Sequence, residues 1–311
     1  MTSAGLLTLI RGAASRMLPE GTLDIASADK PTLLEALRKA HGYSAVFGAG
    51  LMLKNFGEHP VITALLGGDT PVDILERWML LERFGHTRNR TRITETSLSP
   101  HEASLSVHHF AVDGGNIDAL DDFFVWGIFV ALLVRAGFED ISASLSASLA
   151  ETNQDFCLFQ GGITQPFAGS PQNTATLKIS WNPSTRQPID FDMAKEVGPA
   201  MSKTNSLVSL VEKDLVRSWR LNEAARALHT STRNLQRSLR EESTTFSETL
   251  QRSRVDAAQR LMRDRRLSLT EIAFCVGFSD LAHFSRIFRR YLDVPPSAYR
   301  DLIDASEGSA T

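Results

Sequence analysis

The segment NLQRSLR at residues 234–240 recurs as HFSRIFR at residues 283–289, 49 residues farther along the chain. Both copies have apolar residues at their second and sixth positions, an arginine at the fourth and a basic residue at the seventh. Each copy follows a short helical pattern and a turn, and Ala224 and Ala273 share the same offset. Two helix-turn-helix units in tandem are the simplest account of this repeat.

The second copy has clear signals for where its helices begin and end. Ser268 and Glu271 form a capping box, which predicts a helix start. Gly277 predicts the end of that helix, because glycine adopts the left-handed conformation without a steric penalty. Ser279 is then expected to cap the following helix.

The helix that contains the second copy has two faces of different character. Its apolar stripe is aromatic and should face the core, and its other stripe is basic and should face solvent. The inward set is Phe284, Phe288 and Tyr291, and the outward set is His283, Arg286 and Arg290. A basic helix of this kind fits the major groove of DNA.

The first copy shows the same pattern with weaker helix signals. Asn222 is expected to cap its first helix and Ser231 its second, on which Leu235 and Leu239 face inward. The outward residues at i, i+3, i+4 and i+7 are Arg233, Gln236, Arg237 and Arg240. Arginine reads guanine and glutamine reads adenine through pairs of hydrogen bonds, so these side chains are candidate base readers.

A single helix is predicted between the two units, from Phe246 to Asp264. At 1.5 Å per residue it would be about 28 Å long. Successive major grooves on one face of B-DNA lie ~34 Å apart, so this helix would present two reading units to adjacent grooves.

This part of the chain resembles the AraC/XylS family of bacterial transcription regulators. The matching motifs are Glu271-Ile272-Ala273, Gly277-Phe278-Ser279, Phe284–Arg290 and Pro295–Arg300. The resemblance covers residues 208–302 and implies a seven-helix DNA-binding domain with two recognition helices. It departs from the family at Ser243 and Asp293, where many members have glycine, and at Leu281 and Ala282, where polar readers are common.

The overall composition indicates a globular protein of two domains. The chain has 311 residues, 42% of them hydrophobic, and a net charge of −3. From Glu212 onward basic residues outnumber acidic ones, whereas acidic residues predominate before it. An acidic domain joined to a basic one suits a DNA reader attached to a domain that should not bind DNA.

Other features of the chain favour an ordinary cytoplasmic protein. Cys157 and Cys275 form no disulfide framework or metal-binding spacing, and buried apolar roles are expected for both. The N-terminus has no secretory signal pattern. The apolar run from Phe123 to Val134 is too short to cross a bilayer, so a buried helix and no membrane association are expected.

The first half of the chain alternates helical and strand patterns, which predicts an α/β domain. We expect an effector-binding or dimerisation domain over residues 1–206 and an all-α DNA-binding domain over residues 207–311. A linker is predicted at Val197–Ser206, and Leu207–Trp219 is the first expected helix of the second domain. The predicted helices are 31–41, 61–66, 72–84 and 118–137, and the predicted strands are 92–98, 104–110, 141–149 and 174–181.

Residues 32–37 and the run from Ser104 to Leu149 resemble the arabinose-binding-type domain of one AraC branch. This resemblance implies effector sensing or dimerisation, and it does not imply that arabinose is the effector.

No catalytic or metal site is evident in the first half. His108 and His109 should point to opposite faces of a strand. Four acids lie nearby, namely Asp113, Asp118, Asp121 and Asp122, and the last three suit the first turn of a helix better than a metal site. We therefore expect no enzyme activity, no cofactor and no metal.

The location of a ligand site stays open. Arg88, Arg90 and Arg92 could bind a carboxylate, but charged residues also protect an exposed edge strand, and this second interpretation is favoured.

The sequence thus predicts a bacterial transcription regulator, an activator, that binds double-stranded DNA. A small-molecule effector is expected to control it, with RNA polymerase and a second copy of the chain as further partners. The alternative is a ligand-independent or architectural DNA-binding protein whose first domain only oligomerises or binds a protein partner.

Overall fold

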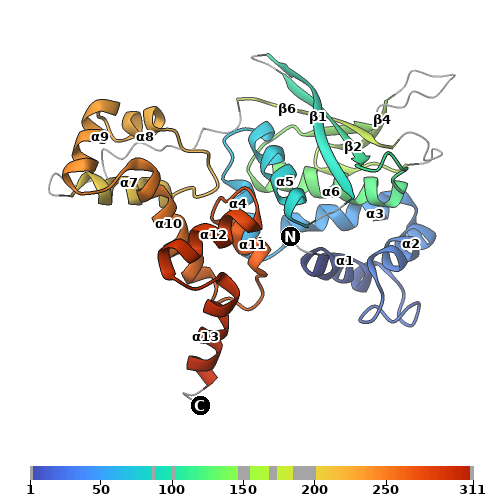
Figure 1. Ribbon diagram of the computed structural model, residues 1–311. Coiled ribbons are helices and arrows are strands. Elements are labelled where there is room, and N and C mark those ends of the chain that lie inside the picture. Colours follow the sequence, from blue (N-terminus) through green and yellow to red (C-terminus); the bar gives the residue numbers. More distant parts are fainter. Residues whose placement is uncertain are drawn as a thin grey trace. The chain divides into compact units, whose positions relative to one another are not determined.

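The structure, a computed structural model, describes residues 3–85, 88–99, 102–145, 155–167, 174–184 and 201–308 (Figure 1). The chain divides into two compact units, Met1–Pro188 and Ile189–Thr311. Each unit has its own core.

The first unit combines helices with one six-stranded sheet. Its helices are α1 (Ser3–Met17), α2 (Lys30–His41), α3 (Tyr43–Leu51), the 3-10 helix η1 (Met52–Asn55), α4 (Pro60–Leu66), α5 (Pro71–Gly85) and α6 (Ala119–Arg135). Its strands are β1 (Asn89–Leu98), β2 (Ala103–Ala111), β3 (Ser142–Leu145), β4 (Phe156–Gln160), β5 (Ile163–Thr164) and β6 (Thr176–Trp181). The expected α/β class of this unit is confirmed.

The strands follow the order β1-β2-β6-β3-β4-β5, and the pairings between them are antiparallel. Burial along β2 alternates strictly, with Leu105, Val107 and His109 facing the helices. His108 therefore points to the opposite face from His109, as expected. β1 is an edge strand, which supports the interpretation of its arginines as edge protection.

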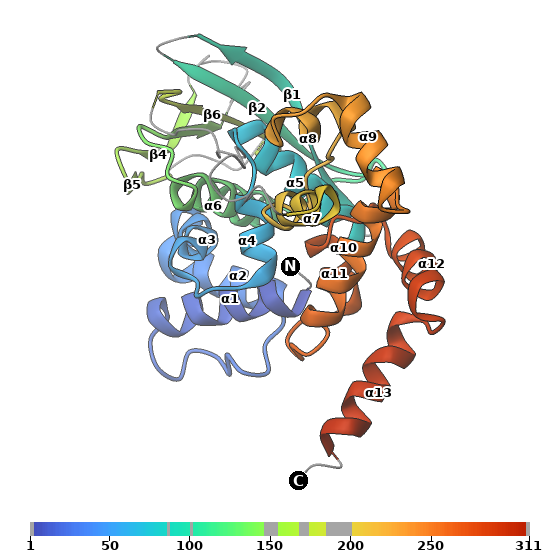
Figure 2. The same cartoon turned by 90° about the vertical axis from the view of Figure 1, so that its left-hand side faces the viewer.

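Helix α6 lies between the sheet and the layer formed by α1, α2 and α3 (Figures 1 and 2). Because it is covered on both sides, it is apolar around most of its circumference and nearly all of it is buried. Two glycines allow α3 and α6 to cross closely. A Cβ at Gly127 would lie 2.0 Å from the carbonyl oxygen of Phe47, and one at Gly50 would lie 2.1 Å from that of Phe124.

Most predicted elements of this unit are present with shifted ends, and two details are wrong. Thr32 and Glu35 suggest a capping box in the sequence, but Asp29 caps α2 by accepting a hydrogen bond from the Thr32 backbone N–H at 3.0 Å. Glu35 pairs instead with Arg38. Helix α3 was not predicted, and the part of the 141–149 strand beyond residue 145 lies outside the described residues.

The second unit is helical. Its helices are α7 (Lys203–Glu212), α8 (Leu221–Ala227), α9 (Thr232–Glu241), α10 (Phe246–Leu261), α11 (Leu269–Cys275), α12 (Leu281–Leu292) and α13 (Pro296–Gly308). One apolar cluster joins α7, α8 and α9 and contains Leu207, Leu210, Val211, Trp219, Ala224, Ala225, Leu228, Leu235 and Leu239.

The start of this unit corrects the prediction of a linker through Ser206. Ser202 caps α7 by accepting a hydrogen bond from the Asn205 backbone N–H at 3.1 Å, so the helix begins at Lys203. It ends at Glu212, well before the expected Trp219. Residues 197–200 of the expected linker lie outside the described part of the chain, and the boundary predicted between residues 206 and 207 stays a prediction.

Among the described residues, no helix combines the length and apolar character that crossing a bilayer would require.

Candidate nucleic-acid interface

The pairs α8–α9 and α11–α12 end their first helix with the same backbone pattern. The N–H of Thr230 donates to the carbonyl of Ala225 at 2.9 Å, and the N–H of Phe278 donates to that of Ala273 at 3.0 Å. Equivalent residues of the first helices, α8 and α11, are therefore 48 positions apart in the sequence. Ala225, rather than Ala224, is therefore the counterpart of Ala273, which corrects the sequence alignment.

The two pairs also begin alike. The carboxylate of Glu223 accepts a hydrogen bond from the backbone N–H of Arg220, and that of Glu271 accepts one from Ser268. The capping box at Ser268 is confirmed. The expected cap at Asn222 is wrong, because α8 begins at Leu221 and Asn222 lies inside it.

Each first helix is followed by a residue in the left-handed conformation. His229 has a φ of 49° and Gly277 a φ of 80°. Gly277 is required for a second reason, since a Cβ there would lie 2.0 Å from the carbonyl oxygen of Leu215. The predicted role of Gly277 is confirmed.

The second turn is one residue longer than the first. Ser231 caps α9, as predicted, but Asp280 rather than Ser279 caps α12. Asp280 accepts a hydrogen bond from the His283 backbone N–H at 2.6 Å, and Ser279 donates its hydroxyl to the same carboxylate. These bonds lower the pKa of Asp280, so it is a carboxylate that supports the helix start at neutral pH.

Helix α9 separates its apolar and polar sides sharply. Leu235 and Leu239 are completely buried in the core. The four predicted readers of this helix are all exposed; they are Arg233, Gln236, Arg237 and Arg240. Arg237 lies 3.7 Å from Glu241 in a surface ion pair, which is weak and leaves the guanidinium accessible.

Helix α12 buries Phe284, Ile287 and Phe288 and exposes Arg286 and Arg290. Its inner face is an aromatic series that includes a contact of 5.4 Å between the ring centroids of Phe284 and Phe288. Ile287 was missed as a core residue, and Tyr291 is only half-buried.

His283 is more engaged than the other predicted readers. Its ring lies edge-on to Phe278 with centroids 5.3 Å apart, and Nδ1 is 3.4 Å from the hydroxyl of Ser279. The imidazole is therefore partly buried and held at the beginning of α12.

Helix α10 connects the two pairs and is shorter than predicted. It ends at Leu261 instead of Asp264, which gives a length of about 24 Å. Its buried side chains include Thr249, Ser253 and Val255.

Arg254 on α10 binds the segment that connects α7 and α8. Its Nη2 donates to the carbonyl oxygens of Leu215 at 3.1 Å and Arg217 at 3.3 Å. Its guanidinium carbon lies 6.0 Å from the centroid of the Phe278 ring, in the turn before α12. Burial lowers the pKa of Arg254 to about 10, which still leaves it protonated at neutral pH. This contact left no signal in the sequence, because Arg254 looks like any other arginine of a charged helix.

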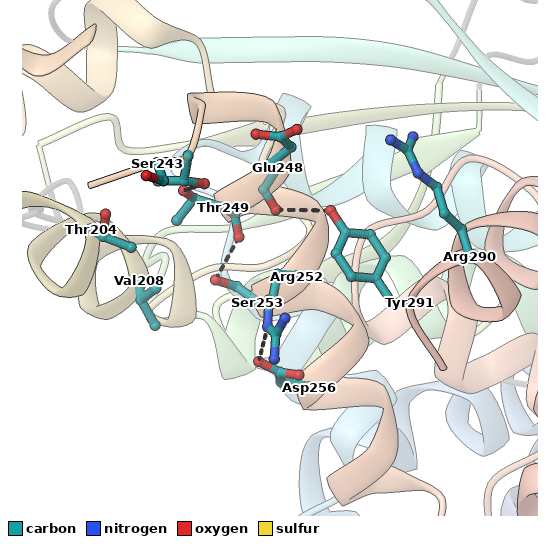
Figure 3. Close-up of a pocket in the computed structure, with 11 residues that line it drawn as sticks. Thr204, Val208, Ser243, Glu248, Thr249, Arg252, Ser253, Asp256, Arg290 and Tyr291 are labelled. Atoms are coloured by element: carbon teal, nitrogen blue, oxygen red, sulfur yellow. Dashed lines mark hydrogen bonds and ion pairs between the residues drawn. The ribbon is translucent and has the colours of Figure 1, made fainter. Parts of the chain in front are cut away.

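A recess of about 420 Å³ lies beside α10, between α7 and α12 (Figure 3). Tyr291 points across it and donates its hydroxyl to the carbonyl of Glu248 at 3.3 Å. Arg252 and Arg290 line the recess, but so do the carboxylates of Glu248 and Asp256. Because the lining carries both signs of charge, the exposed faces of α9 and α12 are better suited to a polyanion than this recess.

Comparison with known proteins identifies the helical unit. Residues 216–301 match a family model described as a helix-turn-helix domain. This stretch forms an AraC-type helix-turn-helix domain.

Curated relatives match over the same part of the chain. The ornithine utilization regulator of Pseudomonas aeruginosa is 41% identical over 81 residues, which are 26% of this chain and 24% of that protein. The dual transcriptional regulator Rns of Escherichia coli is 31% identical over 91 residues, 29% of this chain and 34% of that protein. The chain therefore spans only about a quarter to a third of the length of these relatives.

Solved structures give similar matches. A regulator from Chromobacterium violaceum described as containing an AraC-type DNA-binding domain is 26% identical, with a TM-score of 0.31, over 32% of this chain and 89% of that one. The regulator CdpR of Pseudomonas aeruginosa is 17% identical, with a TM-score of 0.33, over 94% of this chain and 97% of that one.

Proposed function

We propose that this chain is a transcription regulator that binds double-stranded DNA through two helix-turn-helix units. In this proposal α8–α9 and α11–α12 are the two units, α10 joins them, and α9 and α12 are the recognition helices.

The face of α9 is the observation that carries the proposal. Four polar or cationic side chains are exposed on a helix whose opposite side is fixed in the core by Leu235 and Leu239. Arginine and glutamine on a rigid helix can each form two hydrogen bonds with the edge of a base pair in the major groove. A helix fixed in this way holds its readers in position before binding, which lowers the entropic cost of recognition.

We assign the two recognition helices different shares of the selectivity. On α9 we propose Arg233, Gln236 and Arg237 as base readers and Arg240 as a phosphate contact. On α12 we propose Arg286 and His283 as readers and Arg290 as a phosphate contact. The first two residues of α12, Leu281 and Ala282, are exposed and have no hydrogen-bonding side-chain group, so α9 should contribute most of the selectivity.

The α/β unit is proposed to control DNA binding. A small-molecule effector that prefers one arrangement of the chain would shift the population toward it and change how the recognition helices are presented. A homodimer and contacts with RNA polymerase belong to the same proposal, in which the protein acts as an activator.

A second function is kept because one group of residues favours it. Leu98, Val112 and Ile163 are large apolar side chains of the α/β unit that are at least 60% exposed. Leu98 is on β1 and Ile163 is on β5, the two edge strands of the sheet, and an edge strand can pair with a second copy or another protein, in which case no effector is needed.

Selection of binding sites from random duplex DNA by the full-length protein tests the proposal. The expected result is a defined sequence with two informative segments about 10 base pairs apart, one for each unit. Recovery of unrelated sequences, with binding that depends on salt alone, would show that the protein does not read bases.

A further inference from the structure

The α/β unit contains a cavity of about 670 Å³ that no step of DNA reading uses. Its wall is built from the end of β2, the loop that follows it, the first turns of α6 and the residues just before β6. The residues that line the cavity include His108, His109, Gly115, Asp122 and Thr174. This volume lies within the range of roughly 300–1,000 Å³ that small-molecule sites occupy.

A buried polar group lies in the wall of this cavity. Nδ1 of His109 is 2.7 Å from Oδ1 of Asp122, and the hydroxyl of Thr174 donates to Oδ2 of the same carboxylate at 2.5 Å. His109 is 3% exposed and Asp122 is 2% exposed. The indole N–H of Trp126 also donates to the backbone carbonyl of Thr174 at 2.9 Å, which holds Thr174 in position. Burying polar groups costs desolvation energy, so the place of this histidine–aspartate pair beside a cavity suggests a use in binding.

The hydrogen bonds leave one imidazole nitrogen for a ligand. Because Asp122 accepts from Nδ1, this nitrogen carries a proton. Within the described residues, Nε2 of His109 has no hydrogen-bond partner. When Nε2 is protonated as well, it becomes a cationic donor that Asp122 stabilises from behind.

The acids near the cavity already have donors. Asp122 holds His109 and Thr174, and Asp118 caps α6 by accepting from the Leu120 N–H. Asp113 accepts hydrogen bonds from Arg88 and from the Gly115 N–H, and these lower its pKa. The unused binding capacity near the cavity is therefore that of a donor or cation, which favours an anionic ligand.

Other titratable groups face His109 from the elements packed around it. Glu82 on α5 interacts electrostatically with His109. It also accepts a hydrogen bond from the hydroxyl of Thr91, the residue directly opposite His109 in the sheet. His108 also lines the cavity, but its side chain is on the opposite face of β2; burial together with the positive charge of Arg92 lowers its pKa, so it is neutral at neutral pH. Arg88 lies close to Gly115, and its guanidinium holds the loop through Asp113 and the carbonyl of Asn116.

We propose that this cavity is the effector site and that it binds a small carboxylate through Nε2 of His109. The ligand carboxylate accepts a hydrogen bond from Nε2–H of the imidazolium, and Asp122 compensates the ring from the other side. This inference rests on the proposed control of DNA binding by an effector and names the site and the ligand class.

Binding to the full-length protein is the test. The probes are succinate, glutamate, 2-oxoglutarate and benzoate, each compared with a neutral amide of the same shape, and putrescine serves as the cationic control. We expect at least one acid to raise the melting temperature and change the fluorescence of Trp126, whose ring centroid is 5.9 Å from that of His109. The matched amides and putrescine should do neither.

His109→Gln keeps a side-chain N–H for Asp122 but cannot become a cation, so it should weaken binding of that acid by about tenfold or more. His41→Gln is the matched control, because His41 does not line the cavity; its Nε2 lies 2.6 Å from the carbonyl oxygen of Met17. The affinity of this variant for the acid should stay unchanged. If His109→Gln does not fold, Asp122→Asn takes its place as the test variant and should weaken binding of that acid, because an amide cannot compensate a cationic ring.

Three results would overturn the proposal: no stabilisation by any of the four acids, equal stabilisation by acids and amides, or unchanged affinity in folded His109→Gln. Binding of the selected DNA is measured separately on the same preparations. Loss of ligand binding with intact DNA binding would refute the carboxylate site alone, whereas failure to select any DNA sequence would refute the proposed function.

Discussion

Nη2 of Arg254 lies 3.1 Å from the carbonyl oxygen of Leu215. The same oxygen is the atom that a Cβ at Gly277 would meet at 2.0 Å. The carbonyl of Leu215 is thus the point at which α10, the α7–α8 connection and the α11–α12 turn meet. This contact ties the two helix pairs together, and it makes their relative orientation depend on two residues that touch no DNA in the proposed complex.

Replacement of Arg254 by methionine should destabilise the AraC-type domain. The carbonyls of Leu215 and Arg217 would lose a buried donor, which costs roughly 1–3 kcal/mol for each unsatisfied group. Urea unfolding followed by circular dichroism measures the change in the free energy of unfolding. Arg252→Met is the matched control, because Arg252 lies on the same helix with a 72% exposed side chain. Equal stability of the two variants would contradict the role given to Arg254.

Gly277→Ala should be more damaging than an ordinary helix-end substitution. The new Cβ would be placed at a φ of 80° and would collide with backbone that cannot move independently. We expect a loss of at least ~2 kcal/mol in stability together with weaker DNA binding. Gly12→Ala, at an exposed position in the middle of α1 with free space around it, should instead be neutral or stabilise by about 0.5–1 kcal/mol.

Asp293 ends α12 in the left-handed conformation, with a φ of 61°. Asp293→Gly should stabilise the domain by up to about 1 kcal/mol. The relief of backbone strain in the folded state should exceed the entropic cost of a more flexible unfolded chain. Alanine keeps the strain and should not stabilise it. A melting temperature that is lower for Asp293→Gly than for Asp293→Ala would show that φ is not what limits this position.

Glu82 should give the α/β unit a pH-dependent stability. Burial raises the pKa of Glu82 above its usual value of 4.5, against the hydrogen bonds from Thr91 and Trp78. The folded state then holds the proton more tightly than the unfolded state. Stability should fall as the pH rises from about 4.5 through the raised pKa and should become level above it.

Glu82→Gln removes this titration and should flatten that part of the pH profile, as measured by urea unfolding with tryptophan fluorescence. Glu76→Gln, an exposed position on the same helix, should keep the wild-type profile. A wild-type profile that rises over this range would refute the assignment.

The positions that face the core could be predicted from sequence where periodicity was strong. The inward residues Leu235, Leu239, Phe284 and Phe288 followed from helical spacing, and the opposite faces of His108 and His109 followed from strand alternation. Helix caps were less predictable, because two neighbouring polar residues compete for one position and the backbone decides between them. Asp280 rather than Ser279 caps α12 because the turn before it has one extra residue.

Contacts between distant residues left no signal in the sequence. The acids Asp118, Asp121 and Asp122 were expected at the first turn of a helix, where the structure places them. That Asp122 also meets His109 from another element could not be seen in the sequence. Helix α3 was missed because its glycines weaken helix propensity, although Gly50 is required for its close approach to α6. The readers on α9 and α12 stay predictions, since exposure shows access and not recognition.

The most direct test of the central claim is the affinity of Arg237→Ala for the selected DNA, measured by fluorescence anisotropy. The control is Arg263→Ala, which removes the same charge at an exposed position outside the recognition helices. If α9 reads bases, Arg237→Ala should lose about 1–3 kcal/mol of binding free energy and accept other bases at one position of the site. Arg263→Ala should retain both affinity and selectivity. Wild-type affinity and selectivity in Arg237→Ala would contradict the assignment of α9 as a recognition helix.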